Sequence, residues 1–328
     1  MTTVGAMRIV VVGAGLAGLT AARALNDVHE VVVIDKGRGV GGRMSTRRVG
    51  DATLDHGAQF FTTHTDQFAA VVARWQAAGV AQPWFRGRLG PAGVVDADGH
   101  IRFRGVESMN AVAKHLATGL DVRTGTGATS IGQADGSDGW TVTIGDRSLH
   151  AEAVVLTPPV PQSLALLAAG EVVLTADDLA ALTAVRYEPC LAVLALLDGP
   201  SGLPEPGAVD PEDGPIDWMA DNQRKGISSS PAVTIHATAD FSREHWLSPD
   251  EVVVAALLAA AGLPAAPSVA QVQRWRYARP VVVHPARHLL AQGLAPLVFA
   301  GDAFGGAKVE GAVLSGHSAA TSLDPESA

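Results

Sequence analysis

Cysteine is almost absent from this chain, in which Cys190 is the only one. A single cysteine excludes an intramolecular disulfide framework and a cysteine-rich metal site. Its surroundings, Cys190-Leu-Ala-Val-Leu-Ala-Leu-Leu, are typical of a buried strand, so we expect no catalytic role for it. Long apolar runs are missing too, since none approaches the length of about 18 residues that a membrane-spanning helix needs.

Basic charge is also scarce. Lysine occurs only at Lys36, Lys114, Lys225 and Lys308, and 33 acidic residues outnumber 24 basic ones, which gives a net charge of −9. This excess of acidic residues argues against a basic surface that would bind nucleic acid. The amino-terminal MTTVGAM lacks the basic and apolar regions of a signal peptide. We therefore expect a cytoplasmic protein with neither nucleic acid nor a membrane as partner.

Sequence signatures of metal and covalent catalysis are missing as well. We find no nucleophile elbow. His284 and His288 are four residues apart, but the intervening Pro285 argues against one helix face carrying both, so we expect no metal. The length of 328 residues and the 47% hydrophobic content allow one large or two medium-sized domains.

The most informative segment is Arg8–Arg43, which contains a glycine-rich turn between two apolar strands. Gly13, Gly15 and Gly18 form G-x-G-x-x-G directly after the expected strand Ile9–Val12. The first glycine permits the tight turn, the second lets a pyrophosphate approach the backbone, and the third packs the helix on the strand. The free N–H groups at that helix start favour phosphate. Asp35 follows the second strand and is placed to accept hydrogen bonds from a ribose diol, so we predict a dinucleotide site.

Two further motifs resemble those of the flavoprotein superfamily that contains the amine oxidases. Gly41-Gly42-Arg43 resembles the extended motif that contacts the FAD diphosphate there, although Gly-Gly alone is also typical of an ordinary loop. Gly301-Asp302 and the helix expected to start near Gly311 resemble the closing motif. The resemblance implies that the aspartate contacts the ribityl and diphosphate region and that the helix start faces the flavin C2 carbonyl. A helix N-terminus there would stabilise the reduced flavin anion. Close helix packing is a second, compatible interpretation.

Within that superfamily, segments from all parts of the chain resemble the renalases: Gly41-Gly-Arg-Met-Ser-Thr-Arg-Arg, Asp55-His-Gly-Ala-Gln-Phe-Phe-Thr, Thr157-Pro-Pro-Val-Pro-Gln, Trp275-Arg-Tyr and Gly301-Asp-Ala-Phe. Renalases are FAD oxidases of the amine-oxidase-like fold. The resemblance implies oxidation of 2- and 6-dihydro isomers of NAD(P)H to NAD(P)⁺ by hydride transfer to flavin N5, with O₂ reduced to hydrogen peroxide. It also implies a dihydronicotinamide dinucleotide as the small-molecule substrate. Because the only cysteine lies far from either flavin motif, we expect FAD to be bound noncovalently, with a histidyl link as the alternative. The oligomeric state is left open.

Two alternatives remain at this stage. An amine oxidase or desaturase on the same FAD fold is the first, and amine oxidases often place a lysine near flavin N5. Lys225 and Lys308 are the only late lysines, and neither follows the strand where such a lysine is expected, although Lys308 lies close to Glu310 and the expected flavin edge. A flavin-free binding module is the second alternative, and the intact glycine-rich motifs argue against it.

The order of elements predicts an α/β fold, a FAD-binding Rossmann-like domain of the glutathione-reductase or amine-oxidase type with an interleaved β-rich substrate domain. We expect residues 1–64, 101–165 and 290–328 to form the FAD-binding domain, and residues 65–100 and 166–289 the substrate domain. Ser108 is expected to cap a helix. Asp121–Thr124 is expected in a small antiparallel sheet, and Asp198–Pro215 on the surface.

The predicted cofactor-binding residues come from these motifs: Gly13, Ala14, Gly15, Leu16, Ala17, Gly18, Asp35, Lys36, Gly41, Gly42, Arg43, Met44, Gly57, Ala58, Gln59, Phe60, Ala128, Thr157, Pro158, Gly301, Asp302, Glu310, Gly311 and Ala312. No residue is assigned a certain catalytic role.

Candidates for positioning the substrate are His236, Asn222, Trp275, Tyr277, Gln59 and Phe60. Strand alternation puts Thr234, His236 and Thr238 on one face, and Trp275 and Tyr277 could wall a flat-ring site. Each has a structural alternative: a satisfied histidine, a turn-forming asparagine or a core tryptophan. His56 stands where the superfamily motif leads us to expect an apolar residue.

Overall fold

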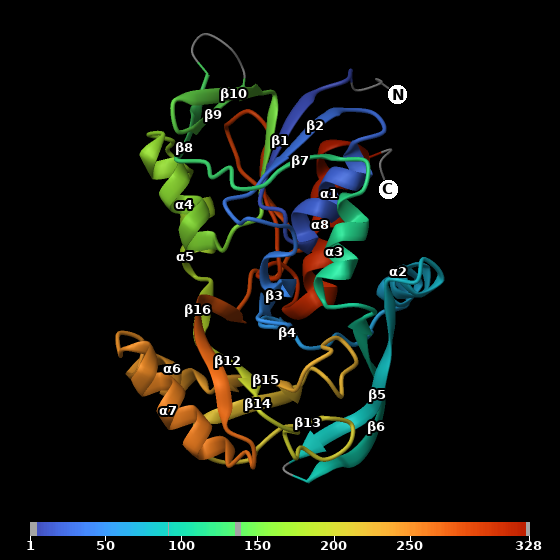
Figure 1. Ribbon diagram of the computed structural model, residues 1–328. Coiled ribbons are helices and arrows are strands. Elements are labelled where there is room, and N and C mark those ends of the chain that lie inside the picture. Colours follow the sequence, from blue (N-terminus) through green and yellow to red (C-terminus); the bar gives the residue numbers. More distant parts are fainter. Residues whose placement is uncertain (1–4, 91, 135–138, 326–328) are drawn as a thin grey trace. The chain divides into compact units, whose positions relative to one another are not determined.

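The structure is a computed structural model that describes residues 5–90, 92–134 and 139–325 (Figure 1). Met1–Val4, part of the segment MTTVGAM, lie outside the described residues. The chain divides into two compact units. The first contains Met1–Gly42, Ala113–Arg186 and Pro280–Ala328, and the second contains Arg43–Val112 and Tyr187–Arg279. Each unit therefore combines segments that are far apart in the sequence.

The first unit is built on a six-stranded sheet in the order β17-β18-β11-β1-β2-β7. Its strands are β1 (Arg8–Val12), β2 (Glu30–Ile34), β7 (Asp121–Arg123), β11 (Ala153–Leu156), β17 (Leu289–Leu290) and β18 (Leu297–Phe299). All neighbouring pairs are parallel except β17 with β18. The runs in β1, β2 and β11 are continuously apolar because strands of a parallel sheet are buried on both faces.

Helices and a smaller sheet complete the first unit. The helices are α1 (Leu16–Leu25), α4 (Val160–Ala169), α5 (Ala176–Thr183) and α8 (Lys308–Leu323), and α3 (Asn110–Ala117) contains the passage from the second unit to the first. The smaller antiparallel sheet consists of β8 (Ser130–Gln133), β9 (Trp140–Ile144) and β10 (Arg147–Ala151). Helices α1 and α8 pack so closely that a Cβ on Gly316 would collide with the carbonyl oxygen of Ala17.

The second unit centres on a five-stranded sheet in the order β13-β14-β15-β12-β16. Its strands are β12 (Arg186–Leu197), β13 (Ala208–Val209), β14 (Ile216–Asp221), β15 (Ala232–Ala237) and β16 (Pro267–Val282). Two antiparallel hairpins accompany it: β3 (Thr46–Val49) with β4 (Ala52–Asp55), and β5 (Ala81–Gly90) with β6 (Gly93–Gly105). The helices are η1 (Gly42–Met44), α2 (Asp66–Ala77), α6 (Ala239–Glu244) and α7 (Asp250–Ala261).

The two faces of this sheet have different coverings. On one face, Val193 and Ile235 belong to an apolar core with Val253 and Leu257 of α7. On the other face, Leu194 packs with the β3–β4 hairpin. Period-two alternation along β15 therefore directs Thr234 and His236 to the hairpin side of the sheet.

The first predicted strand–turn–helix–strand unit is confirmed, and so is the strand that contains Cys190. Asp121–Thr124 was wrongly placed in the small antiparallel sheet, because β7 pairs parallel to β2 at the edge of the large sheet. The stretch 198–215 is not simply a surface connection, since it contains β13 and the buried Leu203. Helices α4, α5 and α6 were not predicted.

Two helix starts also differ from expectation. The last helix begins at Lys308 rather than near Gly311. Ser108 precedes α3, but its hydroxyl donates to Asn110 Oδ1 instead of accepting from a helical N–H. The compact units further place residues 43–64 and 101–112 outside the first unit, whereas we assigned them to the FAD-binding domain. Which unit binds which molecule stays a prediction.

Candidate functional site

The carboxyl ends of the five parallel strands of the first unit gather the predicted cofactor-binding turns. The glycine-rich turn follows β1, Asp35 follows β2, Thr157 follows β11 and Gly301 follows β18. Ala128 lies in the segment after β7. Because carboxyl ends of parallel strands meet at one edge of a sheet, segments more than 280 residues apart in sequence reach the same edge, which is where nucleotide ligands bind in such folds (Figure 1).

The first glycine-rich turn has the geometry that its sequence predicts. Gly13 has φ of 105°, a left-handed conformation that L side chains rarely adopt, and its amide donates to the Ile34 carbonyl at 2.8 Å. A Cβ on Gly18 would collide with the Gly13 carbonyl oxygen, which confirms its role in close packing. Gly15, in contrast, has an extended backbone, and a Cβ there would meet no atom of the chain within 4 Å. Open space beside Gly15 is what an approaching diphosphate requires.

The second glycine pair lies directly against the first turn. The Gly41 amide donates to the Ala14 carbonyl at 2.8 Å, and a Cβ on Gly42 would come within 3.5 Å of Gly15 Cα. Gly41 and Gly42 have φ of 113° and 52°, so both use the backbone freedom of glycine. The pair therefore packs directly on the first glycine-rich turn and is not an unrelated loop.

Asp35 connects the turn to the end of β2. Its Oδ2 accepts from the Ala14 amide at 2.6 Å and its Oδ1 accepts from the Gly37 amide at 2.6 Å. An ionised carboxylate has about four acceptor positions, so each oxygen keeps a lone pair for a ribose hydroxyl. Asp35 thus orders the turn and is still able to bind a ribose. The open space at Gly15 and this acceptor together fit a dinucleotide cofactor.

The start of α8 combines tight packing with a charged residue. A Cβ on Gly311 would collide with the Gly306 carbonyl, so the packing interpretation of this glycine is confirmed. The Gly301 amide donates to Ser315 Oγ at 2.8 Å, which ties the turn after β18 to the helix. Asp302 is buried, Glu310 and Ala312 are half-buried, and the exposed Lys308 has φ of 74°. Their contact with a cofactor stays a prediction.

The other predicted cofactor residues are distributed over both units. In the first, Lys36 Nζ donates to Gln162 Oε1 at 3.0 Å, and Thr157 Oγ1 donates to the Val12 carbonyl at 2.9 Å. In the second, an Arg43 guanidinium nitrogen donates to the Tyr277 carbonyl at 3.2 Å. The remainder lie at these turns or beside Arg43, with Ala14, Leu16, Ala17 and Met44 buried and Gly57, Ala58, Ala128 and Pro158 half-buried.

The second unit contains a buried ion pair that sequence reasoning missed. Lys225 Nζ lies 2.8 Å from Asp55 Oδ2, and neither side chain has any exposed area. Burial lowers the pKa of Lys225, and the charge of Asp55 opposes that shift. Asp55 also accepts from Thr46 Oγ1 at 2.5 Å and from the Met109 amide at 2.9 Å. The ammonium group lies 4.9 Å from the Trp84 ring centroid, a cation–π distance.

Two substrate candidates belong to the network around Asp55. Asn222 is fully buried; its Oδ1 accepts from the Asp55 amide at 3.2 Å and its Nδ2 donates to Thr234 Oγ1 at 3.0 Å. Gln59 is buried, and its Nε2 donates to the Asp55 carbonyl at 2.7 Å. Both side chains form their hydrogen bonds with other groups of the protein. This geometry therefore gives no support to a contact between either side chain and a substrate.

His236 and Trp275 share a single acceptor, the carbonyl oxygen of His56. Trp275 Nε1 donates to it at 2.8 Å, and His236 Nε2 lies 3.3 Å from it. The imidazole of His56 stacks on Trp275 with 5.3 Å between ring centroids and 15° between the planes. Burial lowers the pKa of both His56 and His236 to about 4. His56 is therefore neutral at pH 7 and packs as a flat ring where an apolar residue was expected.

The remaining candidates are half-buried aromatics of the second unit. Tyr277 meets Tyr187 edge-to-face at 5.4 Å. Phe60 lies 5.1 Å from Trp218, and the guanidinium carbon of Arg102 lies 5.9 Å from the Phe60 centroid. Thr238, expected beside His236 on the strand, instead caps α6 by accepting from the Phe241 amide. The structure thus brings together His236, Trp275 and His56, while Phe60 belongs to a separate aromatic group.

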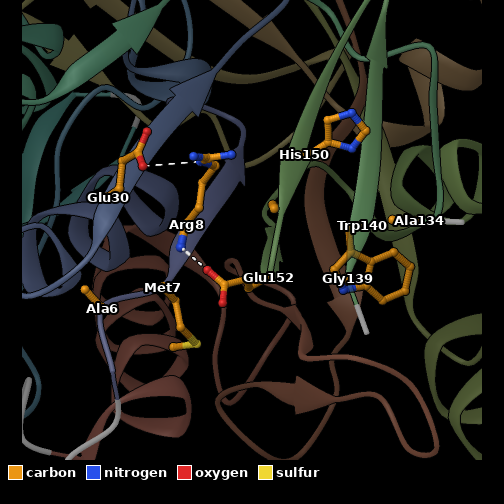
Figure 2. A pocket seen from close by; sticks show the side chains of 10 residues that line it. Ala6, Met7, Arg8, Glu30, Ala134, Gly139, Trp140, His150 and Glu152 are labelled. Atoms are coloured by element: carbon orange, nitrogen blue, oxygen red, sulfur yellow. Dashed lines mark hydrogen bonds and ion pairs between the residues drawn. The ribbon is translucent and has the colours of Figure 1, made fainter. Parts of the chain in front are cut away.

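A cavity of about 610 Å³ lies elsewhere on the first unit (Figure 2). It is lined by side chains that include Arg8, Glu30, Trp140, His150 and Glu152. Arg8 begins β1, whereas the glycine-rich turn follows the end of that strand, so the cavity is distinct from the predicted dinucleotide site. Its polar groups satisfy one another: Arg8 pairs with Glu30 at 3.2 Å, and its amide donates to Glu152 at 2.8 Å.

The described part of the chain offers no support for a metal site, a membrane-spanning helix or a reactive thiol. Over those residues, no group of three or more His, Cys, Asp and Glu could hold a metal ion. The helices found there are all too short or too polar to cross a membrane. Burial raises the pKa of the Cys190 thiol to about 12, which disfavours the nucleophilic thiolate.

Comparison with known families agrees with this arrangement. Residues 11–75 match the NAD(P)-binding Rossmann-like domain, and residues 93–323 match the family described as flavin containing amine oxidoreductase. The fold and the paired glycine turns define a flavin-dependent oxidoreductase. The chain belongs to the flavin containing amine oxidoreductase family, and this membership indicates FAD as its cofactor.

Solved structures with low sequence identity share the fold over the whole length. A candidate protoporphyrinogen oxidase from Exiguobacterium sp. 255-15 is 13% identical with a TM-score of 0.72, covering 97% of this chain and 99% of its own. An A394C mutant of putrescine oxidase is 16% identical with a TM-score of 0.73, covering 98% and 99%. A fatty acid isomerase from P. acnes is 13% identical with a TM-score of 0.66, covering 97% and 98%.

Proposed function

We propose that this protein is a renalase-like oxidase, which converts 2- and 6-dihydro isomers of NAD(P)H to NAD(P)⁺ in the cytoplasm. Noncovalently bound FAD would supply the hydride acceptor and the route of the electrons to O₂, which yields hydrogen peroxide. The glycine turns around Gly15 and the carboxylate of Asp35 would hold the diphosphate and a ribose. Asp302 and the start of α8 would hold the opposite part of the cofactor.

The observation that supports this proposal is the arrangement of two histidines around Trp275: the His56 ring stacks on the indole, and the His56 carbonyl oxygen lies within hydrogen-bond distance of both Trp275 Nε1 and His236 Nε2. With pKa values of about 4, His56 and His236 are weak bases at pH 7. A dihydropyridine becomes aromatic when it loses hydride, so its oxidation requires no strong base and no covalent intermediate. It requires a flat ring held in the correct orientation, a task that neutral aromatic side chains can perform.

The proposed roles of the side chains follow from this requirement. His236 would orient the substrate through a hydrogen bond. Trp275 and Tyr277 would pack against one side of the dihydropyridine ring. Neither a proton transfer nor a nucleophile is assigned to any residue. Lys225 is fully buried and bound to Asp55, so we give it no role as a flavin-edge lysine.

Amine oxidation is the second candidate, favoured by the family match over residues 93–323. The acidic surface charge of the chain would suit a cationic amine in general terms, with a net charge of −9. The two candidates differ in the donor and predict different products. An amine would yield an imine and its hydrolysis products, whereas a dihydronicotinamide would yield NAD(P)⁺.

Oxygen consumption by the FAD-loaded protein separates the two candidates. The 2- and 6-dihydro isomers of NAD and NADP, ordinary 4-dihydroNAD(P)H, putrescine and benzylamine would be supplied singly in air-saturated buffer. The proposal predicts that an abnormal isomer alone is consumed, with one NAD(P)⁺ and one hydrogen peroxide formed per O₂. Turnover of the amines without turnover of the isomers would contradict it and support the second candidate.

A further inference from the structure

The buried pair Asp55–Lys225 lies one residue from the peptide group that binds His236. Asp55 is held at every polar position: its side chain by Lys225, Thr46 and the Met109 amide, and its backbone by Asn222 and Thr234. His56 follows directly in the chain, and its carbonyl oxygen is the acceptor for His236 Nε2 and Trp275 Nε1. The position of that oxygen is therefore set by the network around Asp55.

The partner of His236 Nε2 determines which tautomer the imidazole adopts. A carbonyl oxygen can only accept, so the Nε2 atom that faces it must carry the proton. In a neutral ring, the other nitrogen, Nδ1, is then left with a lone pair. A carbonyl oxygen has two lone pairs and can accept from Trp275 and His236 together.

We propose that Lys225 is a positioning residue that acts through Asp55 and the His56 peptide to hold His236 as the Nε2–H tautomer, with Nδ1 presented as an acceptor. The group that such a nitrogen recognises is an N–H or O–H donor. On a flat-ring substrate, a carboxamide NH₂ supplies that donor. This recognition of the carboxamide rests on the proposed function, whereas the tautomer of His236 does not.

Two features of the network distinguish this role from simple stabilisation. Lys225 Nζ also lies 3.4 Å from Gln59 Oε1, and Gln59 Nε2 donates to the carbonyls of Asp55 and Gly57. The ammonium group therefore contacts the side chains at both ends of the segment 55–59. The positive charge of Lys225 also disfavours protonation of His236. Loss of Lys225 should thus alter the acceptor geometry and the protonation of His236, in addition to stability.

The test is ¹⁵N NMR of holoprotein with labelled histidine, with His236→Gln used to assign the His236 signals. Wild type should give one protonated and one unprotonated ring nitrogen for His236 at pH 7, with the proton on Nε2. Lys225→Met should average the two signals or shift them toward the imidazolium form. The double variant Asp55→Asn/Lys225→Met removes the unpaired charge while keeping an oxygen acceptor at residue 55, and should restore the single tautomer.

A matched control separates positioning from general destabilisation. Leu257→Ala creates a cavity in the core on the face of the sheet opposite to the β3–β4 hairpin, and should leave the His236 signals unchanged. If Lys225→Met yields no folded holoprotein, Lys225→Gln keeps a neutral donor and should show the same averaging to a smaller extent. An unaltered His236 tautomer in the folded Lys225 variant, or the same averaging in Leu257→Ala, would overturn the proposal.

Anaerobic reduction of the bound flavin provides the functional arm. At saturating dihydronicotinamide isomer, Lys225→Met should slow reduction by roughly tenfold, and the double variant should recover most of that loss, since misplacement of an orienting group by about 1 Å can cost up to 100-fold. If no isomer reduces the flavin of the wild-type protein, the proposed function is refuted. The proposal about the His236 tautomer is unaffected by that result, because the tautomer is measured without substrate. A changed tautomer with an unchanged reduction rate would overturn the positioning role.

Discussion

Lys225 Nζ donates to Asp55 Oδ2 across 2.8 Å in the interior of the second unit, 170 residues apart in sequence. The pair has no access to water, and the other oxygen of Asp55 is also hydrogen-bonded. These hydrogen bonds are important because a buried charge without a partner strongly destabilises the folded state. The segment 55–59, which carries the acceptor for His236 and Trp275, is therefore held by hydrogen bonds at both Asp55 and Gln59.

Removal of one partner of this pair should destabilise the protein strongly. Lys225→Met leaves the Asp55 carboxylate buried and unpaired, and we expect a loss of roughly 3–5 kcal/mol in the free energy of unfolding. Asp55→Asn/Lys225→Met should lose considerably less, because no lone charge remains. Urea unfolding of both variants measures the difference. Equal losses in the single and double variants would show that the charge pairing is unimportant.

Stability should fall on acidification because of His56 and His236. Their folded pKa values of about 4 lie below the unfolded value of 6.5, so between these pH values the unfolded chain binds protons that the native protein does not. The stabilisation is complete above pH 6.5 and is lost progressively toward pH 4. At pH 5 each histidine lowers the free energy of unfolding by up to about 2 kcal/mol relative to its value above pH 6.5. Melting temperatures from pH 7.5 to 4.5 should decline less steeply in His56→Leu than in wild type, and parallel curves would contradict this.

Gly15 and Gly18 should respond differently to added side chains. Gly15→Val places its side chain in open space, so the apoprotein should keep its melting temperature while FAD affinity falls by roughly ten- to 100-fold. Gly18→Ala should destabilise the apoprotein itself, because its Cβ collides with Gly13. Gly5→Val, also in open space, is the control and should change neither property. Normal FAD affinity in Gly15→Val would remove this turn from the cofactor site.

Asp302 should contribute to FAD retention. Asp302→Ala removes a buried carboxylate at the end of the turn after β18, and loss of a charged hydrogen bond of about 1.5–3 kcal/mol should weaken FAD affinity by roughly ten- to 100-fold. The ratio of flavin to protein absorbance after gel filtration measures the effect. Asp302→Asn, which keeps the shape, should retain more FAD than Asp302→Ala. Full flavin content in both variants would refute the role.

His236 should affect reduction without affecting cofactor content. His236→Ala removes the orienting imidazole, so anaerobic reduction by substrate should slow by roughly tenfold or more while FAD stays bound. His245→Ala changes a histidine at the end of α6 that packs on Phe241, and it serves as the control. An unaltered reduction rate in His236→Ala would remove this residue from the substrate site.

Local spacing explains why part of the site was predictable from the sequence. The strand–glycine turn–helix unit occupies one continuous segment, and the fixed offsets of Gly13, Gly15 and Gly18 follow from the turn itself. Periodicity likewise predicted the buried strand around Cys190. Asp121–Thr124 was misplaced because sheet membership depends on pairing with β2, about 90 residues earlier, which a short run does not reveal.

The network around Asp55 was not predictable for a similar reason. Asp55 and Lys225 come from a hairpin and from the turn after β14, and no spacing rule connects them. Asn222 stays a candidate on residue type alone, and its complete burial and its hydrogen bonds within the protein became visible only in the fold. The scarcity of lysine, which occurs only four times in the chain, was the one available hint that Lys225 has a special role.

The most direct test of the proposed function is anaerobic stopped-flow absorbance at the flavin band. The FAD-loaded protein would be mixed separately with 2- and 6-dihydroNAD(P), ordinary 4-dihydroNAD(P)H and simple amines. We predict fast bleaching by an abnormal dihydro isomer alone, with NAD(P)⁺ as the product. Bleaching by amines, or by none of these compounds, would contradict the renalase-like function while leaving the FAD fold intact.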